Sequence, residues 1–207
     1  MSDIINSAES LSLTKKVSIA QTKSQSGRRL AQKRGPTLYN LEVKVPTQRL
    51  NGDKYYLIEE EMMKLGYGSE TFNSANISGV LPTGMTSPRG VWSFSPVVSG
   101  ANQTGTSIDV YIGSATVIIG YAKALDYVQF TGSRKVYQIT ADASSNGSGV
   151  VTLQLNSPLV GSPGDLANVV FGDSVDFNFA IMKKSPTSYL PGELVQYGDF
   201  VFEEVIE

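Results

Sequence analysis

The sequence predicts an all-β protein with one helix, in which a small β-barrel interrupts a larger β domain. Three observations lead to this fold class. Segments of alternating apolar and polar residues lie near both ends of the chain, and short strand-like runs separated by Gly- and Asp-containing turns fill the region between them. One segment alone has helical spacing. The 207 residues, 41% of them hydrophobic, are enough to bury a core.

The first fifty residues predict a long hairpin. Apolar residues recur at every second position in both of its arms, and the segment 22–37 between them contains the turn formers Gly27, Gly35 and Pro36. The apolar positions are Leu11, Leu13, Val17 and Ile19 in one arm and Tyr39, Leu41, Val43 and Val45 in the other. We therefore expect two half-buried antiparallel strands, with the segment between them as the tip.

A single amphipathic helix is predicted after the hairpin. Tyr55, Ile58, Met62 and Leu65 recur at intervals of three and four, Asn51 or Asp53 can cap the start, and Gly66 can end the helix. The run Glu59, Glu60 and Glu61 is expected on the outward side of this helix. No basic or polar partner lies nearby in the sequence, so a solvated or partner-facing edge is favoured over a catalytic carboxylate cluster.

The rest of the chain divides into a loop-rich segment, a group of short strands and two closing strands. Residues 74–105 are rich in Ser, Gly, Pro and Asn, and "VWSFSPVV" at 91–98 is the only strand candidate there. Strands expected at 107–112, 127–130, 135–140 and 149–155 predict the small barrel, with a hairpin turn at Asn146-Gly147. Strands at 175–182 and 199–207 return to the first domain. The expected domains are residues 1–99 together with 173–207, and an inserted barrel at 100–172.

The composition excludes several kinds of chemistry. The chain contains no Cys and no His, so disulfides, thiolate zinc sites, cysteine nucleophiles and histidine bases are ruled out. No phosphate-binding glycine loop is present, and the apolar runs are too short to cross a membrane or to form a secretory signal. We therefore expect no enzyme activity, no cofactor, no metal, no export and no membrane insertion.

Charge is distributed unevenly along the chain. Residues 1–50 carry nine Lys or Arg and three acidic residues, whereas the remaining 157 residues carry eight and sixteen. Five basic residues lie at the expected hairpin tip: Lys23, Arg28, Arg29, Lys33 and Arg34. Three interpretations stay open for this tip: a nucleic-acid arm, a contact with an acidic surface of a neighbouring subunit, or a solvated loop. The tip has no aromatic residue for stacking on bases, which favours a protein partner, and the acidic helix edge 59–61 is the candidate partner.

Two stretches resemble a known family. "SLTKKVSIAQTKSQSGRRLAQKRGPTLYNLEVKVPT" is similar to the opening of bacteriophage distal tail proteins, and residues 104–160 are similar to the module inserted in them. The closing "GDFVFEEVIE" also resembles their last strand. The matching module residues are Asp126, Val128, Phe130, Val136, Tyr137, Thr140, Asp142, Gly147, Gly149, Leu153, Pro158 and Leu159. Leu125 departs from the pattern, because the family usually has Gly there.

The resemblance implies a structural role in a virion, for a protein made in the host cytoplasm. It implies a β-sandwich or barrel tail domain, six copies in a ring at the distal end of the tail tube, contacts with the tube protein and the baseplate hub, and no catalysis. A tube-initiating or hub-surrounding baseplate protein is the second interpretation, and a nucleic-acid-binding protein with a basic arm is the third. In a ring, the basic tips could also touch the passing genomic DNA transiently.

Overall fold

The computed structural model describes residues 3–23, 29–64, 71–75, 88–184 and 187–206, which form a mainly β structure with one long helix. The elements are α1 (Asp3–Asn6), β1 (Ser10–Lys23), β2 (Arg29–Lys44), β3 (Gln48–Arg49), α2 (Asp53–Lys64), β4 (Thr71–Ala75), β5 (Val97–Val98), β6 (Ser107–Tyr111), β7 (Tyr127–Phe130), β8 (Val136–Gln138), β9 (Val150–Gln154), β10 (Val169–Phe171), the 3-10 turn η3 (Gly172–Ser174), β11 (Asp176–Lys184), β12 (Ser188–Leu190), β13 (Leu194–Gln196) and β14 (Phe200–Glu204). The strands pair antiparallel in four sheets.

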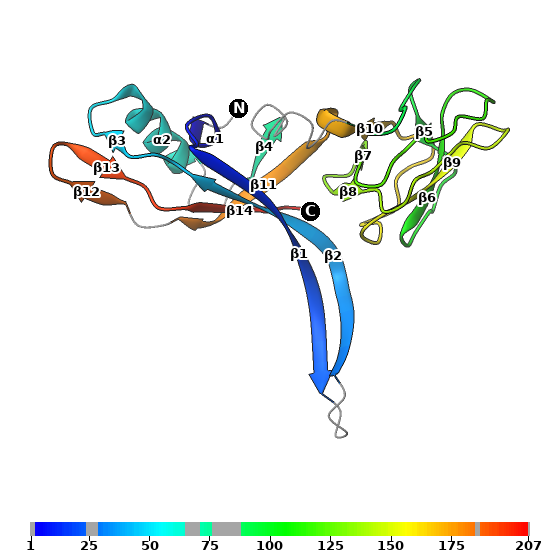
Figure 1. The fold of residues 1–207 in the computed structure, drawn as a ribbon, viewed down its shortest axis with the longest axis horizontal. Coiled ribbons are helices and arrows are strands. Elements are labelled where there is room, and N and C mark those ends of the chain that lie inside the picture. Colours follow the sequence, from blue (N-terminus) through cyan, green and yellow to red (C-terminus); the bar gives the residue numbers. More distant parts are fainter. Residues whose placement is uncertain (1–2, 24–28, 65–70, 76–87, 185–186, 207) are drawn as a thin grey trace.

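The largest sheet joins the two ends of the chain. Its order is β1-β2-β14-β11-β4, so the last strand of the sequence lies between the second and the eleventh. This pairing confirms the expectation that N- and C-terminal segments share one sheet. Beyond its contact with β14, the β1–β2 hairpin leaves the sheet and extends away from the body (Figure 1).

One face of this sheet is covered by α1 and α2, and together they enclose a first hydrophobic cluster. The alternating residues of β2 and β14 are buried there because every second side chain of a strand points to the same face. Ile58 and Met62 are the buried residues of α2, which runs from Asp53, one of the two predicted cap positions, to Lys64. Leu65 and the predicted end at Gly66 lie outside the described residues. A small sheet, β12-β13-β3, continues the body beside α2 (Figure 1).

A second cluster lies in the module that contains β5 to β10. The module consists of two three-stranded sheets, β5-β6-β9 and β10-β7-β8, around buried residues that include Trp92, Val98, Ile108 and Leu153. Trp92 and Val98 precede residue 100, the expected start of the insertion. The limits of the two domains stay a prediction.

The predicted barrel is not closed among the strands that the structure describes. The two sheets of the module are joined by isolated bridges and single backbone hydrogen bonds rather than by continuous ladders. One bridge pairs Val97 with Asn168, between β5 and the start of β10, and another pairs Ile139 with Leu155, between the ends of β8 and β9. Strands of two to five residues offer too few ladder hydrogen bonds to continue from one sheet into the next. The predicted turn at Asn146-Gly147 is present: the Gly149 N–H donates to the Asn146 carbonyl, and the Asn146 N–H donates to the Val150 carbonyl, each at 2.9 Å. The strand after this turn, β9, pairs along its length with β6.

Helices that could cross a membrane are absent from the described part of the chain, since none is long and apolar enough.

Candidate assembly site

The basic residues assigned to the hairpin tip lie mostly on strands. Lys23 ends β1 opposite Arg29, which begins β2, and Lys33 pairs with Ile19 further along the ribbon. Arg34 also lies within β2, whereas Arg28 is outside the described residues. The hairpin itself is therefore confirmed, but the predicted wide loop from residue 22 to 37 is wrong.

A bulge explains why the chain passes through Gly35 and Pro36 without turning back. The register shifts between the pairs Val17 with Thr37 and Ile19 with Lys33, so three residues of β2 oppose one residue of β1. Gly35 adopts a φ of 76°, which glycine tolerates at no steric cost, and a bulge accommodates the missing N–H of Pro36. Turn-forming residues here extend the ribbon and bend it.

The three carboxylates of the predicted acidic edge each have a partner within the chain. Glu59 accepts a hydrogen bond of 3.0 Å from the Tyr197 hydroxyl, and Glu61 accepts one of 2.6 Å from the backbone N–H of Ile4. Glu60 is exposed and forms an ion pair of 2.6 Å with Lys64 one helical turn later. Glu60 is therefore the most accessible of the three, and the pairing of this edge with the basic residues of the hairpin stays a prediction.

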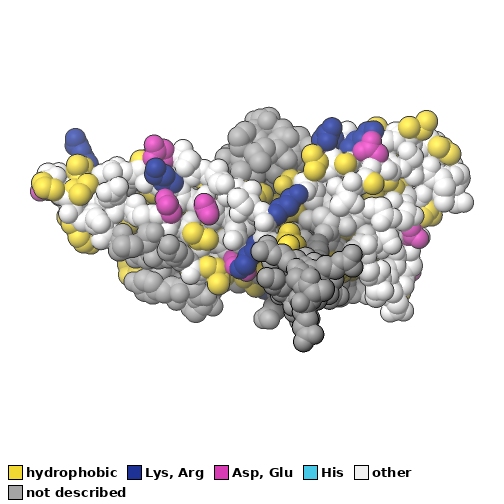
Figure 2. All heavy atoms as spheres, turned by 60° about the horizontal axis from the view of Figure 1, so that its bottom comes forward, with side chains coloured by type: hydrophobic (Ala, Val, Ile, Leu, Met, Phe, Trp, Pro, Cys, Tyr) yellow, Lys and Arg dark blue, Asp and Glu magenta, His cyan; other side chains and the backbone are white. Residues whose placement is uncertain are grey.

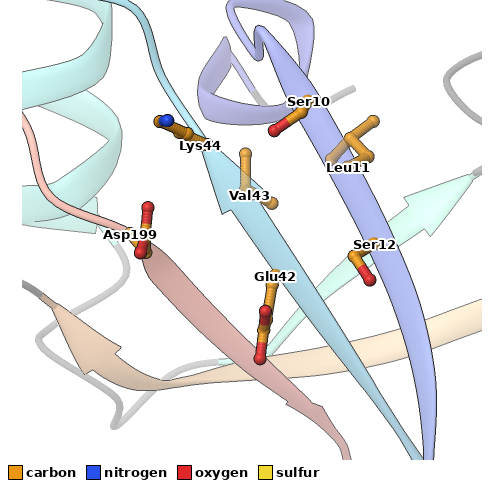
Figure 3. A pocket seen from close by; sticks show the side chains of 7 residues that line it. All are labelled: Ser10, Leu11, Ser12, Glu42, Val43, Lys44 and Asp199. Carbon is orange, nitrogen blue, oxygen red and sulfur yellow. The ribbon is translucent and has the colours of Figure 1, made fainter.

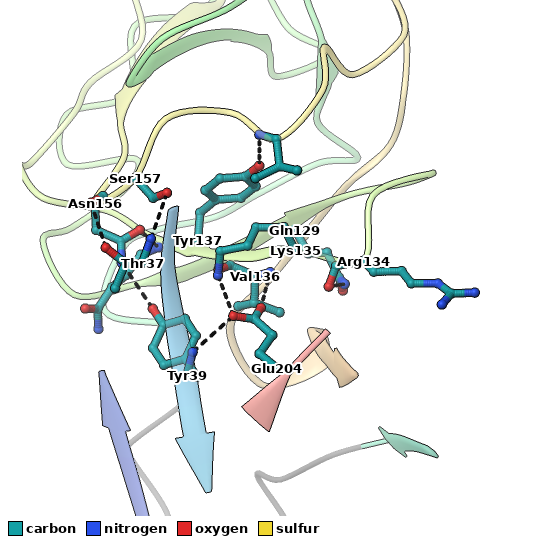
Figure 4. Close-up of polar contacts among 12 residues, drawn as sticks. Thr37, Tyr39, Gln129, Arg134, Lys135, Val136, Tyr137, Asn156, Ser157 and Glu204 are labelled. Atoms are coloured by element: carbon teal, nitrogen blue, oxygen red, sulfur yellow. Dashed lines mark hydrogen bonds and ion pairs between the residues drawn. The ribbon is translucent and has the colours of Figure 1, made fainter. Parts of the chain in front are cut away.

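A buried ion pair connects the module to the large sheet, and the sequence prediction missed it. The Lys135 ammonium lies 2.6 Å from a Glu204 carboxylate oxygen, and both side chains are fully enclosed. Glu204 also accepts hydrogen bonds from the backbone N–H groups of Val136, at 2.9 Å, and Tyr39, at 3.2 Å (Figure 4). The ammonium lies 4.8 Å from the centre of the Tyr39 ring, which adds a cation–π contact.

Burial dominates the electrostatics of this pair. Loss of hydration raises the pKa of the Glu204 carboxyl above its ordinary value, and the attraction of Lys135 opposes that shift. Burial likewise raises the pKa of the Tyr39 hydroxyl, so this hydroxyl stays protonated at neutral pH. The carboxylate is thus tolerated in the interior because an ammonium and two N–H groups satisfy it.

Further polar contacts continue the junction on both sides of the ion pair. The Thr37 N–H donates to the Ser157 hydroxyl at 3.2 Å, next to the bulge of the hairpin. The Gln129 side chain accepts from the N–H of Asp176 and donates to its carbonyl, each at 2.9 Å. Lys15 of β1 donates to the Gln138 side chain. The module is therefore attached to the hairpin base, to β11 and to β14 (Figure 4).

Asp126 organises the entrance to the module. Its buried carboxylate accepts four hydrogen bonds: from the backbone N–H groups of Arg89 (2.6 Å), Gly90 (3.0 Å) and Lys123 (2.9 Å) and from the Trp92 indole (2.7 Å). The preceding residue, Leu125, has a φ of 79° and an exposed side chain. The position where the resembling family has Gly therefore keeps the left-handed backbone that favours Gly.

Replacing Leu125 by Gly is expected to stabilise the protein. A left-handed conformation strains leucine by about 1–2 kcal/mol, and the larger unfolded-state entropy of Gly offsets about 0.5–1 kcal/mol of that relief. We expect Leu125→Gly to raise the free energy of unfolding by up to about 1 kcal/mol in urea denaturation. Val117→Gly is the control, since Val117 is exposed without a positive φ, and it is expected to lower stability. Equal losses for both variants would contradict the strain argument.

A shallow hollow lies at the base of the hairpin. Its lining residues come from β1, β2 and the start of β14: Ser10, Leu11, Ser12, Glu42, Val43, Lys44 and Asp199 (Figure 3). Its polar side chains lie on the solvent side of the sheet, opposite the buried residues of β2. Carboxylates, hydroxyls and one ammonium can bind polar groups, but they provide no paired nucleophile and base.

The described surface carries mixed charges (Figure 2). Groups of three or more His, Cys, Asp or Glu that could hold a metal ion are absent from the described residues. Figure 2 shows Lys and Arg interspersed with Asp and Glu over the described part of one face, which carries no large patch of a single charge.

One signal in the sequence could have identified Glu204. Phe200, Phe202 and Glu204 alternate with exposed or half-buried residues, so the period of the strand places the carboxylate on the same buried face as the two rings. Lys135 gave no such signal, because its burial depends on the module docking against β2 and β14. Comparisons with known proteins found no family model and no curated protein that matches this chain.

Proposed function

We propose that this protein is a structural component of a bacteriophage tail tip or baseplate, which assembles as a ring at the distal end of the tail tube. The observation that carries the proposal is the long β1–β2 ribbon, which extends away from the body (Figure 1); among the described strands, none but β2 pairs with β1. A two-stranded ribbon is only marginally stable by itself, and an open edge of fourteen residues invites pairing with another chain.

In this proposal the large sheet is a tail-tube-like domain and the module is the inserted barrel-like unit of the resembling family. Six copies join head to tail, and the ring connects the tail tube to the baseplate hub or the receptor-binding apparatus. A heterologous contact between identical subunits closes into a ring when its rotation closes. The work of the protein is mechanical, so it needs no cofactor, and its place is the virion.

Imaging of the purified full chain tests this function. Mass photometry and negative-stain microscopy are expected to give a closed ring of about six subunits with an open centre. A protein that stays monomeric and binds DNA with an affinity that falls steeply with salt would contradict the proposal and favour the basic-arm interpretation. A ring that binds a hub protein without a tube protein would favour the hub-surrounding alternative.

The basic residues have their own test within this proposal. Serine at positions 23, 28, 29, 33 and 34 removes five positive charges from the hairpin, and we expect the rings to dissociate at lower salt than wild type. The same five substitutions leave the folded body unchanged, as circular dichroism can check. Rings that persist with unchanged salt dependence would show that these charges are not part of the subunit interface.

A further inference from the structure

The apolar face of the hairpin continues beyond the core that covers its base. Leu11 and Leu13 pack against the first hydrophobic cluster, and Val17 and Ile19 are the next apolar residues at the same period. Their side chains are 42% and 51% exposed. Two β-branched apolar residues thus face solvent on a ribbon that has no other strand beside β1 among the described elements.

A complementary surface lies on the outer side of α2. Tyr56 and Met63 are seven residues apart, which places them on one stripe of the helix, and they are 58% and 68% exposed. Glu60 lies between them on the same stripe, and Tyr55 packs edge-on against Tyr56 at 5.3 Å between ring centres. Exposed tyrosine and methionine on a rigid helix are typical of the centre of a protein interface.

We propose that Val17 and Ile19 of one copy of this chain pack on Tyr56 and Met63 of a second copy, as the apolar centre of a head-to-tail subunit contact. This inference rests on the proposed ring function and names the residues of its interface. Charge supports the second copy as the occupant: the segment 22–37 carries five basic residues and no acidic one, whereas α2 carries four acidic and two basic residues.

Geometry makes the contact intermolecular. β1 continues for six residues past Val17, a reach of about 20 Å at about 3.3 Å per residue. The hairpin extends from the sheet in a direction away from α2, so the arm of a chain does not meet its own helix (Figure 1). A surface that binds a different surface on the next copy is a heterologous contact, which generates a ring when its rotation closes and an open filament when it does not.

Two double variants separate the halves of this contact. The arm variant is Val17→Ser with Ile19→Ser, and the helix variant is Tyr56→Ser with Met63→Ser. Each removes two apolar side chains from the proposed interface, and we expect the apparent dissociation constant of the ring to rise about 100-fold. The control is Val117→Ser with Ile119→Ser, a Val-x-Ile pair on the module that is 57% and 84% exposed. It is expected to assemble as wild type does.

Mixing the two variants gives the sharper result. The arm variant keeps an unchanged helix, and the helix variant keeps an unchanged arm. In an equimolar mixture, the arm of a helix variant can therefore still bind the helix of an arm variant, but the two altered surfaces cannot extend the assembly further. We expect heterodimers in analytical ultracentrifugation and no rings. If the wild-type chain forms rings and the arm variant assembles equally well, this inference is overturned and the ring function stands. A wild-type chain that is monomeric at all concentrations would overturn both.

A cross-link tests the contact without removing it, should the serine variants fail to fold. The chain contains no cysteine, so Ile19→Cys with Tyr56→Cys introduces the only two thiols. Mild oxidation is expected to link them between copies and to give a ladder of covalent oligomers. The matched control, Ile119→Cys with Tyr56→Cys, is expected to stay monomeric under denaturing conditions. Ladders of equal intensity from both proteins, or none from the first, would contradict the proposed pairing.

Discussion

Lys135→Met is expected to lower the free energy of unfolding by about 3–5 kcal/mol, because it leaves the Glu204 carboxylate buried without its counter-charge. The ammonium lies 2.6 Å from that carboxylate, and neither side chain is accessible to water. Urea denaturation followed by circular dichroism measures the loss. Methionine keeps much of the length of the lysine side chain, so the effect reports mainly on charge.

The control breaks an exposed ion pair of the same chain. Lys16 lies 2.7 Å from Glu203, the neighbour of Glu204, but 56% of its side chain is exposed. Lys16→Met is expected to cost about 1 kcal/mol or less, since water solvates the remaining carboxylate. Similar losses in both variants would show that the buried pair contributes no more than a surface pair.

The loss caused by Lys135→Met is expected to depend on pH. Burial raises the pKa of Glu204, and the attraction of Lys135 is the largest opposing influence, so the pKa rises further in the variant. The folded variant then takes up a proton more readily than the unfolded chain. Its stability is therefore highest below the unfolded pKa of about 4.5 and is lost as the pH rises through the higher folded pKa. Denaturation at pH 5 and pH 7 is expected to show the larger deficit at pH 7.

Asp126→Ala is the second substitution with a large expected effect. Four N–H donors point at the carboxylate, and three of them belong to the backbone of the segments that meet at the module entrance. Leaving buried donors unsatisfied costs about 1–3 kcal/mol each, so we expect a total loss of about 3 kcal/mol or more. The module is expected to loosen first at this entrance.

Trp92 reports directly on that change. It is the only tryptophan of the chain, and its indole N–H donates to Asp126 at 2.7 Å. We expect the fluorescence of the folded variant to shift to longer wavelength as water reaches the indole. Asp142→Ala is the matched control, because Asp142 also accepts a backbone N–H but is exposed, and its loss is expected to be much smaller. Unchanged fluorescence and stability in Asp126→Ala would contradict its role as an anchor.

Local sequence patterns predicted those helices and strands in which apolar residues recur at a regular spacing. The apolar spacing around Ile58 and Met62 gave the helix, and the strands predicted at 127–130 and 199–207 lie close to the observed bounds of β7 and β14. The alternation of Tyr39, Leu41 and Val43 located only the second half of β2, which begins at Arg29. Short elements without a period of their own were missed, among them β4, β10, β12 and β13. Gly35 and Pro36 caused a strand segment to be predicted as a loop, because the residue types that form turns also form β-bulges.

The candidate site was less predictable, because its contacts join distant parts of the chain. Lys135, Tyr39 and Glu204 come together from three separate segments, and no local pattern indicates that a lysine is buried by the docking of one unit on another. The carboxylates of α2 were correctly placed on the helix. Two of them accept hydrogen bonds from residues distant in the sequence, Tyr197 and Ile4, which the prediction did not foresee. Such partners depend on tertiary structure alone.

The position of β14 within the large sheet has a consequence for how the protein is made. The last strand in sequence order lies between β2 and β11, so the sheet stays open while residues 200–204 are still inside the ribosome. The module, whose strands are complete by residue 171, is free to fold during translation. Chains interrupted before Phe200 would therefore display a folded module on an unfinished sheet. Late insertion of a central strand thus makes completion of the large sheet one of the last steps of folding.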